Sequence, residues 1–407
     1  MTSTATTTPS RGRLVLILGT LTAIGPLSID LYLPSFPAVA KSLGVDVAAV
    51  QLTLATYLAG LAVGQIVYGP LSDRMGRRAP LVAGLALYIV ASVACAFAPS
   101  LPFLAAARFV KALGGCSGMV IARAIVRDHF DERDSASLYS TLMLVMGAAP
   151  ILAPSIGGQL LLVGSWRTLF GVLAVIGTVF LGIATFLLPE SLAVEARTRH
   201  GPGQILRSVG VMLKNSHFRR MSLAGGAAGA AMFAYISGSP FVFIELFHVT
   251  PQQYGLIFGM NAMGLIIASQ LNRWLVHRSG VVTVLRAAIT VAVLANAVLW
   301  AAIRAGAGLE VILPALFFGI ACVGLINPNS TAAAMAPFGR QAGVASALFG
   351  TLISTLSAAA SVAVSAFANG TAMPMATVMV CCSLLALILV MLERFAPGAA
   401  VEGAGAR

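Results

Sequence analysis

Residues 69–78, GPLSDRMGRR, form a short polar connection between one apolar run that ends at about residue 70 and another that begins at about residue 80. Apolar runs of about 20 residues are long enough to cross a bilayer as α-helices. Because so short a connection cannot cross the membrane, the two helices that it joins must run antiparallel. The glycines of this connection, Gly69 and Gly76, permit a tight reversal of the chain. Its charged residues require a polar surface, and they are Asp73, Arg74, Arg77 and Arg78.

The composition extends this pattern to the whole chain. Hydrophobic residues make up 58% of the 407 residues and charged residues only 9%, against about 25% charged in globular proteins. Mean hydropathy is +0.94, which excludes a soluble domain. The net charge of +12 does not indicate a nucleic-acid partner, because no segment gathers basic residues on a soluble face. The five cysteines lie in apolar runs without ligand spacing, so we expect no metal and no cofactor.

Apolar runs separated by Gly, Pro or charge occur at residues 14–38, 49–70, 80–98, 102–126, 136–163, 168–188, 218–246, 252–273, 281–303, 309–331, 341–368 and 373–395. The first run is longer than the core of a signal peptide, so we expect it to be retained as a helix. The sequence therefore predicts an all-α polytopic membrane protein with twelve transmembrane helices in a bundle.

The long polar stretch at residues 189–217 divides the twelve runs into six and six. Gly60 and Leu61 recur 204 positions later as Gly264 and Leu265, and the same offset brings Leu71, Arg74 and Gly76 onto Leu275, Arg278 and Gly280. An offset of half the chain indicates a tandem duplication of a six-helix unit around a central site. We expect a tail at 1–13, a first half at 14–188, a linker at 189–217, a second half at 218–395 and a tail at 396–407.

The basic residues set the expected orientation. Of the 25 lysines and arginines, only Lys41, Arg167 and Arg304 fall on the side of the membrane opposite the N-terminus, and only Arg108 and Lys111 fall within a span. Basic loops stay in the cytosol. Both termini and the linker are therefore expected to be cytosolic.

The connection at residues 69–78 can place a carboxylate against a helix N-terminus and arginines against other carboxylates, as a latch for one conformational state. The alternative is that its arginines only orient the chain. It resembles the G-x-L-x-D-R-x-G-R-R signature of the major facilitator superfamily, and the resemblance implies two six-helix halves around a central cavity and Asp128 as a partner of this loop. The second half has His277 in the place of Asp73, so we expect the latch in the first half.

Asp30 lies 16 residues into the first span, about 24 Å along a helix, and is therefore embedded in the membrane. An embedded carboxylate is retained only where it faces a wet cavity, pairs with a base or takes up a proton. Asp30 is therefore our candidate for the coupling proton site, and a structural carboxylate satisfied by a neighbour is the alternative.

Arg108 and Lys111 are three residues apart in the fourth span and so share a face. Arg108 resembles the arginine of the superfamily's R-x-x-Q-G signature, which implies a coupling role, whereas Lys111 stands where Gln is usual. Lys111 is either a cavity residue or an amine that reaches the outer interface through its long stem. Because two cations exceed the one carboxylate, we expect the cavity to prefer neutral and acidic compounds to cationic ones.

The fifth span contains MGAAPILAPSIGGQ at residues 146–159. Its glycines and prolines suit a hinge and close helix contact, although small residues also serve ordinary packing. The stretch resembles the antiporter signature g-x-x-x-G-P-x-x-G-G with Ala153 in place of one glycine, which favours an exporter. The expected hinge residues are Gly147, Pro150, Pro154, Gly157 and Gly158.

Aromatic and methionine side chains in several spans can line an adaptable apolar cavity, although each alone is better explained by helix packing. With Lys111, the candidates are Tyr32, Phe36, Tyr57, Tyr139, Met143, Met146, Tyr235, Phe258 and Met260.

Stretches such as SIDLYLPSFPAVAKSLG and SGSPFVFIELFHVTPQQYG are similar to the bicyclomycin-resistance and chloramphenicol/florfenicol-resistance (Bcr/CflA) family of drug:proton antiporters. The resemblance implies a monomeric exporter of small amphipathic antibiotics in the bacterial inner membrane, driven by protons and not acting as an enzyme. The alternative is a proton-coupled exporter of an endogenous metabolite or biosynthetic product. The expected partners are a small-molecule substrate, protons and the lipid bilayer.

Overall fold

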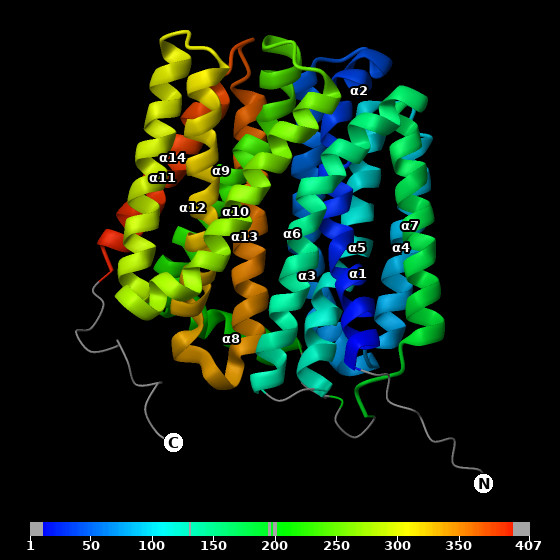
Figure 1. The fold of residues 1–407 in the computed structure, drawn as a ribbon. Coiled ribbons are helices and arrows are strands. Elements are labelled where there is room, and N and C mark those ends of the chain that lie inside the picture. Colours follow the sequence, from blue (N-terminus) through cyan, green and yellow to red (C-terminus); the bar gives the residue numbers. More distant parts are fainter. Residues whose placement is uncertain (1–10, 130–131, 194–196, 198–201, 394–407) are drawn as a thin grey trace. The chain divides into compact units, whose positions relative to one another are not determined.

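The protein was analysed as a computed structural model that describes residues 11–129, 132–193, 197 and 202–393. These residues form helices joined by short turns and contain no strand. The chain divides into two compact units, which are described separately (Figure 1). Unit 1 takes in Met1–Gly201 and Val249–Leu256, and unit 2 takes in Pro202–His248 and Ile257–Arg407.

Unit 1 contains the whole of the predicted first half at residues 14–188. Its helices are α1 (Arg11–Asp30), the short 3₁₀ turn η1 (Leu33–Ser35), α2 (Phe36–Leu43), α3 (Val47–Met75), α4 (Arg78–Ala96), α5 (Leu101–His129), α6 (Glu132–Val163) and α7 (Trp166–Leu187).

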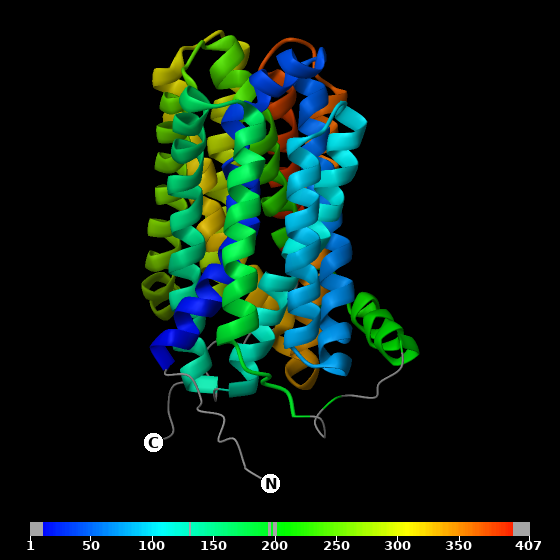
Figure 2. The same ribbon diagram turned by 90° about the vertical axis from the view of Figure 1, so that its right-hand side faces the viewer.

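Unit 2 contains α8 (Pro202–Lys214), α9 (Ser216–Pro240) with a π-helical extension η3 (Phe241–Leu246), α11 (Val281–Arg304), α12 (Leu309–Met335), the turn η4 (Ala336–Gln341), α13 (Ala342–Ala366) and α14 (Met373–Met391). Helix α10 (Pro251–Ser279) begins in unit 1 and continues in unit 2. In Figure 2 the short green helix α8 lies at an angle to the long helices of its unit. The polar stretch between the two sets of six runs therefore contains a helix, and Met212 anchors it in the apolar core of unit 2.

Eleven helical segments among the described residues are long and apolar enough to cross a membrane. The predicted fifth run is α6, whose apolar part, Ala148–Val163, is shorter than the others. With α6 the chain has the twelve spans that the sequence predicts, and the all-α membrane fold is confirmed.

The first span is broken just after Asp30. The sequence predicts one helix over residues 14–38, whereas α1 ends at Asp30 and the chain re-enters helical structure at Leu33. Pro34 explains the break, because proline has no N–H to donate to the carbonyl group four residues earlier, which here is that of Asp30, and its ring clashes with that group. Asp30 therefore stands at an interrupted helix end.

Glycines bring α5 close to three neighbouring helices. A Cβ atom added to Gly60 of α3 would collide with the carbonyl oxygen of Phe109, and one added to Gly114 would lie 2.5 Å from the backbone nitrogen of Tyr88 on α4. A Cβ atom on Gly118 would lie 2.6 Å from the carbonyl oxygen of Leu21 on α1. Small residues let membrane helices approach closely, so α5 is fixed tightly against α1, α3 and α4.

Candidate functional site

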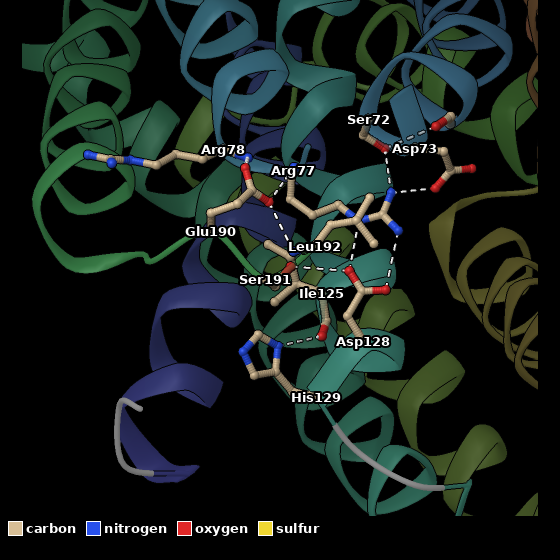
Figure 3. A network of polar contacts seen from close by, with 11 residues as sticks. Ser72, Asp73, Arg77, Arg78, Ile125, Asp128, His129, Glu190, Ser191 and Leu192 are labelled. Atoms are coloured by element: carbon tan, nitrogen blue, oxygen red, sulfur yellow. Dashed lines mark hydrogen bonds and ion pairs between the residues drawn. The ribbon is translucent and has the colours of Figure 1, made fainter. Parts of the chain in front are cut away.

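Arg77 is the centre of a polar network at one end of unit 1 (Figure 3). Its guanidinium group is buried and forms a two-pronged ion pair with Asp128, with Nε 2.8 Å from Oδ2 and Nη2 3.2 Å from Oδ1. Its Nη1 donates to the hydroxyl of Ser72 at 3.0 Å and to Oδ1 of Asp73 at 2.5 Å. Burial alone would lower the pKa of Arg77, but the two carboxylates hold this pKa above its ordinary value. The network therefore joins α3, α4 and α5.

Glu190 is a member of this network that the sequence analysis missed. Its carboxylate accepts hydrogen bonds from the backbone N–H groups of Arg77 at 2.8 Å, Arg78 at 3.2 Å and Leu192 at 3.1 Å. Partial burial would raise the pKa of Glu190, but these N–H groups and the nearby Arg197 hold it below the ordinary value. The carboxylate at the N-terminus of α4 is thus that of Glu190. The sequence suggests Asp73 for this position.

Gly76 makes this arrangement possible. Its φ of +90° lies in the left-handed region that favours glycine. A Cβ atom at this position would lie 2.5 Å from Oε2 of Glu190 and 2.9 Å from the guanidinium of Arg197. The second glycine of the loop, Gly69, has nothing within 4 Å of an added Cβ atom, so no close approach requires it.

The structure brings only some of the predicted latch residues together. Asp73 pairs with Arg77, and Asp128 joins the same arginine from the end of α5 and also accepts a hydrogen bond from Ser191 at 3.1 Å. Arg74 is exposed and is not part of these contacts. Arg78 points the other way and donates to the carbonyl oxygen of Thr185 on α7. We define the Arg77 network as Ser72, Asp73, Arg77, Asp128, Glu190 and Ser191.

Asp30 is buried inside unit 1, with 4% of its surface exposed. Within the part of the chain that the structure describes, its carboxylate makes no hydrogen bond and no ion pair. The expected counterparts, Arg108 and Lys111, lie in the same unit but are not in ion-pair contact with it. The structural alternative, a carboxylate satisfied by a neighbour, therefore has no described partner to support it.

Arg108 is fully buried in an aromatic pocket. Its Nε donates to the carbonyl oxygen of Thr53 at 3.0 Å, and its Cζ lies 4.1 Å from the ring centre of Tyr32 and 5.1 Å from that of Tyr57. Cation–π contacts of this kind stabilise a guanidinium that has left water. Its two terminal nitrogens have no hydrogen-bond partner among the described residues.

Lys111 is also fully buried, so its amine does not reach the outer interface. Its Nζ lies 5.1 Å from the ring centre of Tyr88 on α4 and 4.9 Å from that of Phe170 on α7. No acceptor within the described ranges bonds to it. Of the two positions left open by the sequence, the interior of the helix bundle is the one observed.

The glycines of the antiporter-like stretch on α6 make two close helix contacts. A Cβ atom on Gly157 would collide with the carbonyl oxygen of Leu31, the residue that follows Asp30. A Cβ atom on Gly158 would lie 2.7 Å from the carbonyl oxygen of Pro251, and Gln252 donates to the carbonyl oxygen of Gly158 at 2.7 Å. Pro150 and Pro154 lie inside the helix. The surroundings of the fifth expected hinge residue, Gly147, lie outside the described residues.

The aromatic candidates for the substrate cavity are mostly packed within their own units. Tyr32, Phe36 and Tyr57 are buried in unit 1, and Tyr32 contacts Phe36 and Phe170 with ring centres 5.0 and 5.2 Å apart. In unit 2, Tyr235 and Phe258 stack at 5.7 Å and are buried.

Met260, in contrast, has 61% of its surface exposed. The side chains of Tyr139, Met143 and Met146 lie outside the described residues. The described histidines, cysteines and carboxylates form no group of three that could hold a metal ion.

A second glutamate follows the last helix of unit 2. Glu393 is buried and lies 3.1 Å from Nδ1 of His217 and 3.2 Å from Nη1 of Arg220. Nε2 of His217 lies 2.9 Å from the carbonyl oxygen of Ala333. Glu190 holds the corresponding place after α7 in unit 1. Glu190 follows the apolar run at 168–188, and Glu393 lies at the end of the run at 373–395. A carboxylate at the end of an apolar run is the sequence signal that could have singled them out.

Comparisons with known proteins agree with this architecture. The family model of the Major Facilitator Superfamily matches residues 18–362. The chain is 36% identical to YdgK of Bacillus subtilis, an uncharacterized MFS-type transporter, over 345 residues. This match covers 83% of the present chain and 85% of YdgK. The chain is also 30% identical to a bicyclomycin resistance protein homolog of Haemophilus influenzae over 376 residues. This match covers 92% of the present chain and 94% of the relative.

Among solved structures, the human organic anion transporter MFSD10 shares the fold with a TM-score of 0.70 at 18% identity, over 94% of this chain and 100% of that one. The matched family model covers most of the twelve spans, and the relatives extend over nearly the same length. The chain therefore belongs to the Major Facilitator Superfamily and is a multi-pass membrane transporter of small molecules rather than an enzyme.

Proposed function

We propose that the protein is a drug:H⁺ antiporter that exports small amphipathic compounds, such as bicyclomycin-like or amphenicol-like drugs, across the bacterial inner membrane. The proposed form is a monomer. Both termini lie in the cytosol, as the distribution of basic residues indicates. The observation that carries the proposal is the buried carboxylate of Asp30, for which the described residues provide no hydrogen-bond or ion-pair partner.

A carboxylate in a dry part of a membrane protein is costly when it is charged. Asp30 has no described counterion, so the neutral, protonated form is the one compatible with its surroundings. Loading and release of this proton are then tied to conformational changes that expose Asp30 to water on one side or the other. Such a group couples proton entry to substrate export.

The location of Asp30 suits this role. It stands at the broken end of α1, and the next residue, Leu31, is in direct backbone contact with Gly157 of the antiporter-like stretch. A movement of α6 against α1 therefore acts on the backbone beside the proton site. The contact supports an antiport mechanism in which the bend of α6 and the protonation of Asp30 depend on each other.

Proton entry supplies enough energy for this work. One elementary charge moving down about 100 mV releases about 2.3 kcal/mol, before a pH gradient is added. The name of the Haemophilus influenzae relative, a bicyclomycin resistance protein homolog, supports an antibiotic as the cargo.

The test is a panel of drug-susceptibility measurements in a host that lacks its own efflux pumps. We expect the wild-type protein to raise resistance to uncharged amphipathic antibiotics, and Asp30→Asn to abolish the effect at equal protein level. Unchanged susceptibility to every drug, together with proton-driven export of a cellular metabolite, would favour the metabolite exporter instead.

A further inference from the structure

Lys111 is a buried amine to which the proposed mechanism gives no task. It lies on α5 one turn after Arg108, it is 0% exposed, and it faces the rings of Tyr88 and Phe170. An ammonium ion without hydrogen-bond acceptors is costly in such a place, because ring faces replace only part of the hydration that the ion loses. The pocket therefore suits the neutral amine better than the ammonium.

Arg108 strengthens this conclusion. A guanidinium does not give up its proton in a protein, so this part of unit 1 already holds one positive charge without a described carboxylate partner. A second charge one helical turn away would be repelled by the first. Lysine can lose its proton when it is buried, and so Lys111 is the cation that can become neutral.

The carboxyl group able to exchange a proton with Lys111 lies in the same unit. The titratable and charged groups that face Lys111 are Arg108 on its own helix and Tyr88 and Cys95 on α4, whereas α7 presents the apolar ring of Phe170. None of these is a carboxyl group, and among the described residues of unit 1 the only buried carboxyl group is that of Asp30.

A hydrogen-bonded pair connects α1, which carries Asp30, to α4, whose Tyr88 ring faces Lys111. The hydroxyl of Tyr88, whose ring faces Lys111, lies 2.8 Å from the hydroxyl of Ser28, which is two residues before Asp30 on α1. Both hydroxyls are buried and each can donate and accept a proton. Two glycines of α5 hold this arrangement together, because Gly114 packs closely against α4 and Gly118 against α1.

We propose that Lys111 is a second proton-exchange site of unit 1, neutral in the conformation described and charged when it receives the proton of Asp30. In that step the O–H bond of the Asp30 carboxyl group breaks and an N–H bond forms at Nζ of Lys111. The neutral acid and amine become a carboxylate and an ammonium, so the net charge of unit 1 does not change. The inference rests on the proposed antiport function and deepens it, because it assigns the proton two positions during the cycle.

The protonation state of Lys111 can be observed directly, because the chain has three lysines, Lys41, Lys111 and Lys214. Purified protein labelled with ¹³C at the lysine ε position and placed in lipid nanodiscs should give three resonances by NMR. At about pH 8, well below the ordinary lysine pKa, we expect two signals typical of ammonium and one typical of a neutral amine. The amine signal should be missing from Lys111→Arg. Three ammonium signals would overturn the proposal.

The role in coupling is tested by transport of chloramphenicol into inverted vesicles. Lys111→Met keeps the length and apolar stem of the side chain without a titratable group, and Lys41→Met is the matched control at an exposed lysine. We expect Lys111→Met to carry chloramphenicol down the concentration gradient of the drug. We expect its accumulation of chloramphenicol in the presence of a proton gradient to fall to the level seen without one.

Proton-driven accumulation by Lys111→Met equal to that of Lys41→Met would overturn the second site and leave the antiport function intact. Wild-type protein that moves chloramphenicol without any response to the proton gradient would instead contradict the antiport function itself, and with it this inference.

Discussion

Arg77 and Asp128 form a two-pronged ion pair between the start of α4 and the end of α5, with distances of 2.8 and 3.2 Å. The pair is nearly buried, since the side chain of Arg77 is 3% exposed and that of Asp128 12%. A buried pair of this kind is geometrically specific, and losing one member leaves the other charge without compensation. It therefore holds the loop at residues 69–78 in one conformation.

Replacing Arg77 by alanine should lower the stability of the protein by about 3 kcal/mol, since it leaves two carboxylates of the network without their cation. Arg77→Lys should recover only part of this loss, because an ammonium cannot make both bonds to Asp128. Thermal unfolding in detergent provides the measurement. The matched control is Arg74→Ala, an exposed neighbour whose replacement should change stability by no more than about 0.5 kcal/mol. Equal effects at positions 74 and 77 would show that the network does not stabilise the fold.

The two aspartates of the network should differ in their effect on transport. Asp128→Asn should reduce turnover more strongly than Asp73→Asn, because Asp73 is 40% exposed and its pair with Arg77 is weakened by solvent. Substrate affinity should stay within a few fold in both variants, since the network changes the populations of states and not the binding contacts. Transport rates at saturating substrate, with binding measured separately, distinguish these effects. Unchanged turnover in both variants would leave the loop as a determinant of orientation only.

Glu190 should make the stability of the protein depend on pH. Its pKa in the folded state lies below the ordinary value, because the N–H groups at the start of α4 and Arg197 favour its charged form. A carboxyl group of this kind contributes stability above its unfolded pKa of about 4.3 and loses it as the pH falls through the lower folded pKa. The melting temperature of Glu190→Gln should therefore lie below that of the wild type near pH 7. The gap should close below about pH 4, and a gap that is constant with pH would contradict this role.

Gly157 offers a test of the contact between α6 and α1. A Cβ atom there would collide with the backbone of Leu31, which cannot move aside as a flexible side chain would. Gly157→Ala should therefore displace α6 from the residues beside Asp30 and reduce proton-driven export. Gly171→Ala on α7, where an added Cβ atom meets nothing within 4 Å, serves as the control. Export by Gly157→Ala at the rate of Gly171→Ala would argue against a coupled movement of α6 and Asp30.

The sequence predicts the spans well because each depends on a local property, a run of apolar residues long enough to cross a bilayer. The contacts of the network are harder to predict, since Arg77 and Glu190 are 113 residues apart and meet only because α4 and α7 are neighbours in the bundle. The choice of Arg77 over Arg74 likewise depends on where the helix ends at Met75 and on the turn at Gly76.

The environment of the embedded charges also depends on the packing. The sequence predicts that Asp30, Arg108 and Lys111 lie within the membrane, but not whether they pair. In the structure the aromatic rings of Tyr32, Tyr57, Tyr88 and Phe170 surround the two cations, and these rings come from separate parts of the chain. Only the fold determines that aromatic rings face these cations in the described part of the chain.

The most direct test of the account is proton-gradient-driven export of chloramphenicol by Asp30→Asn in inverted vesicles. The amide resembles the protonated acid in shape and charge but cannot release a proton, so the variant should bind chloramphenicol and fail to accumulate it. Accumulation against a concentration gradient at the wild-type level, with equal protein in the membrane, would contradict the role of Asp30 as the coupling site.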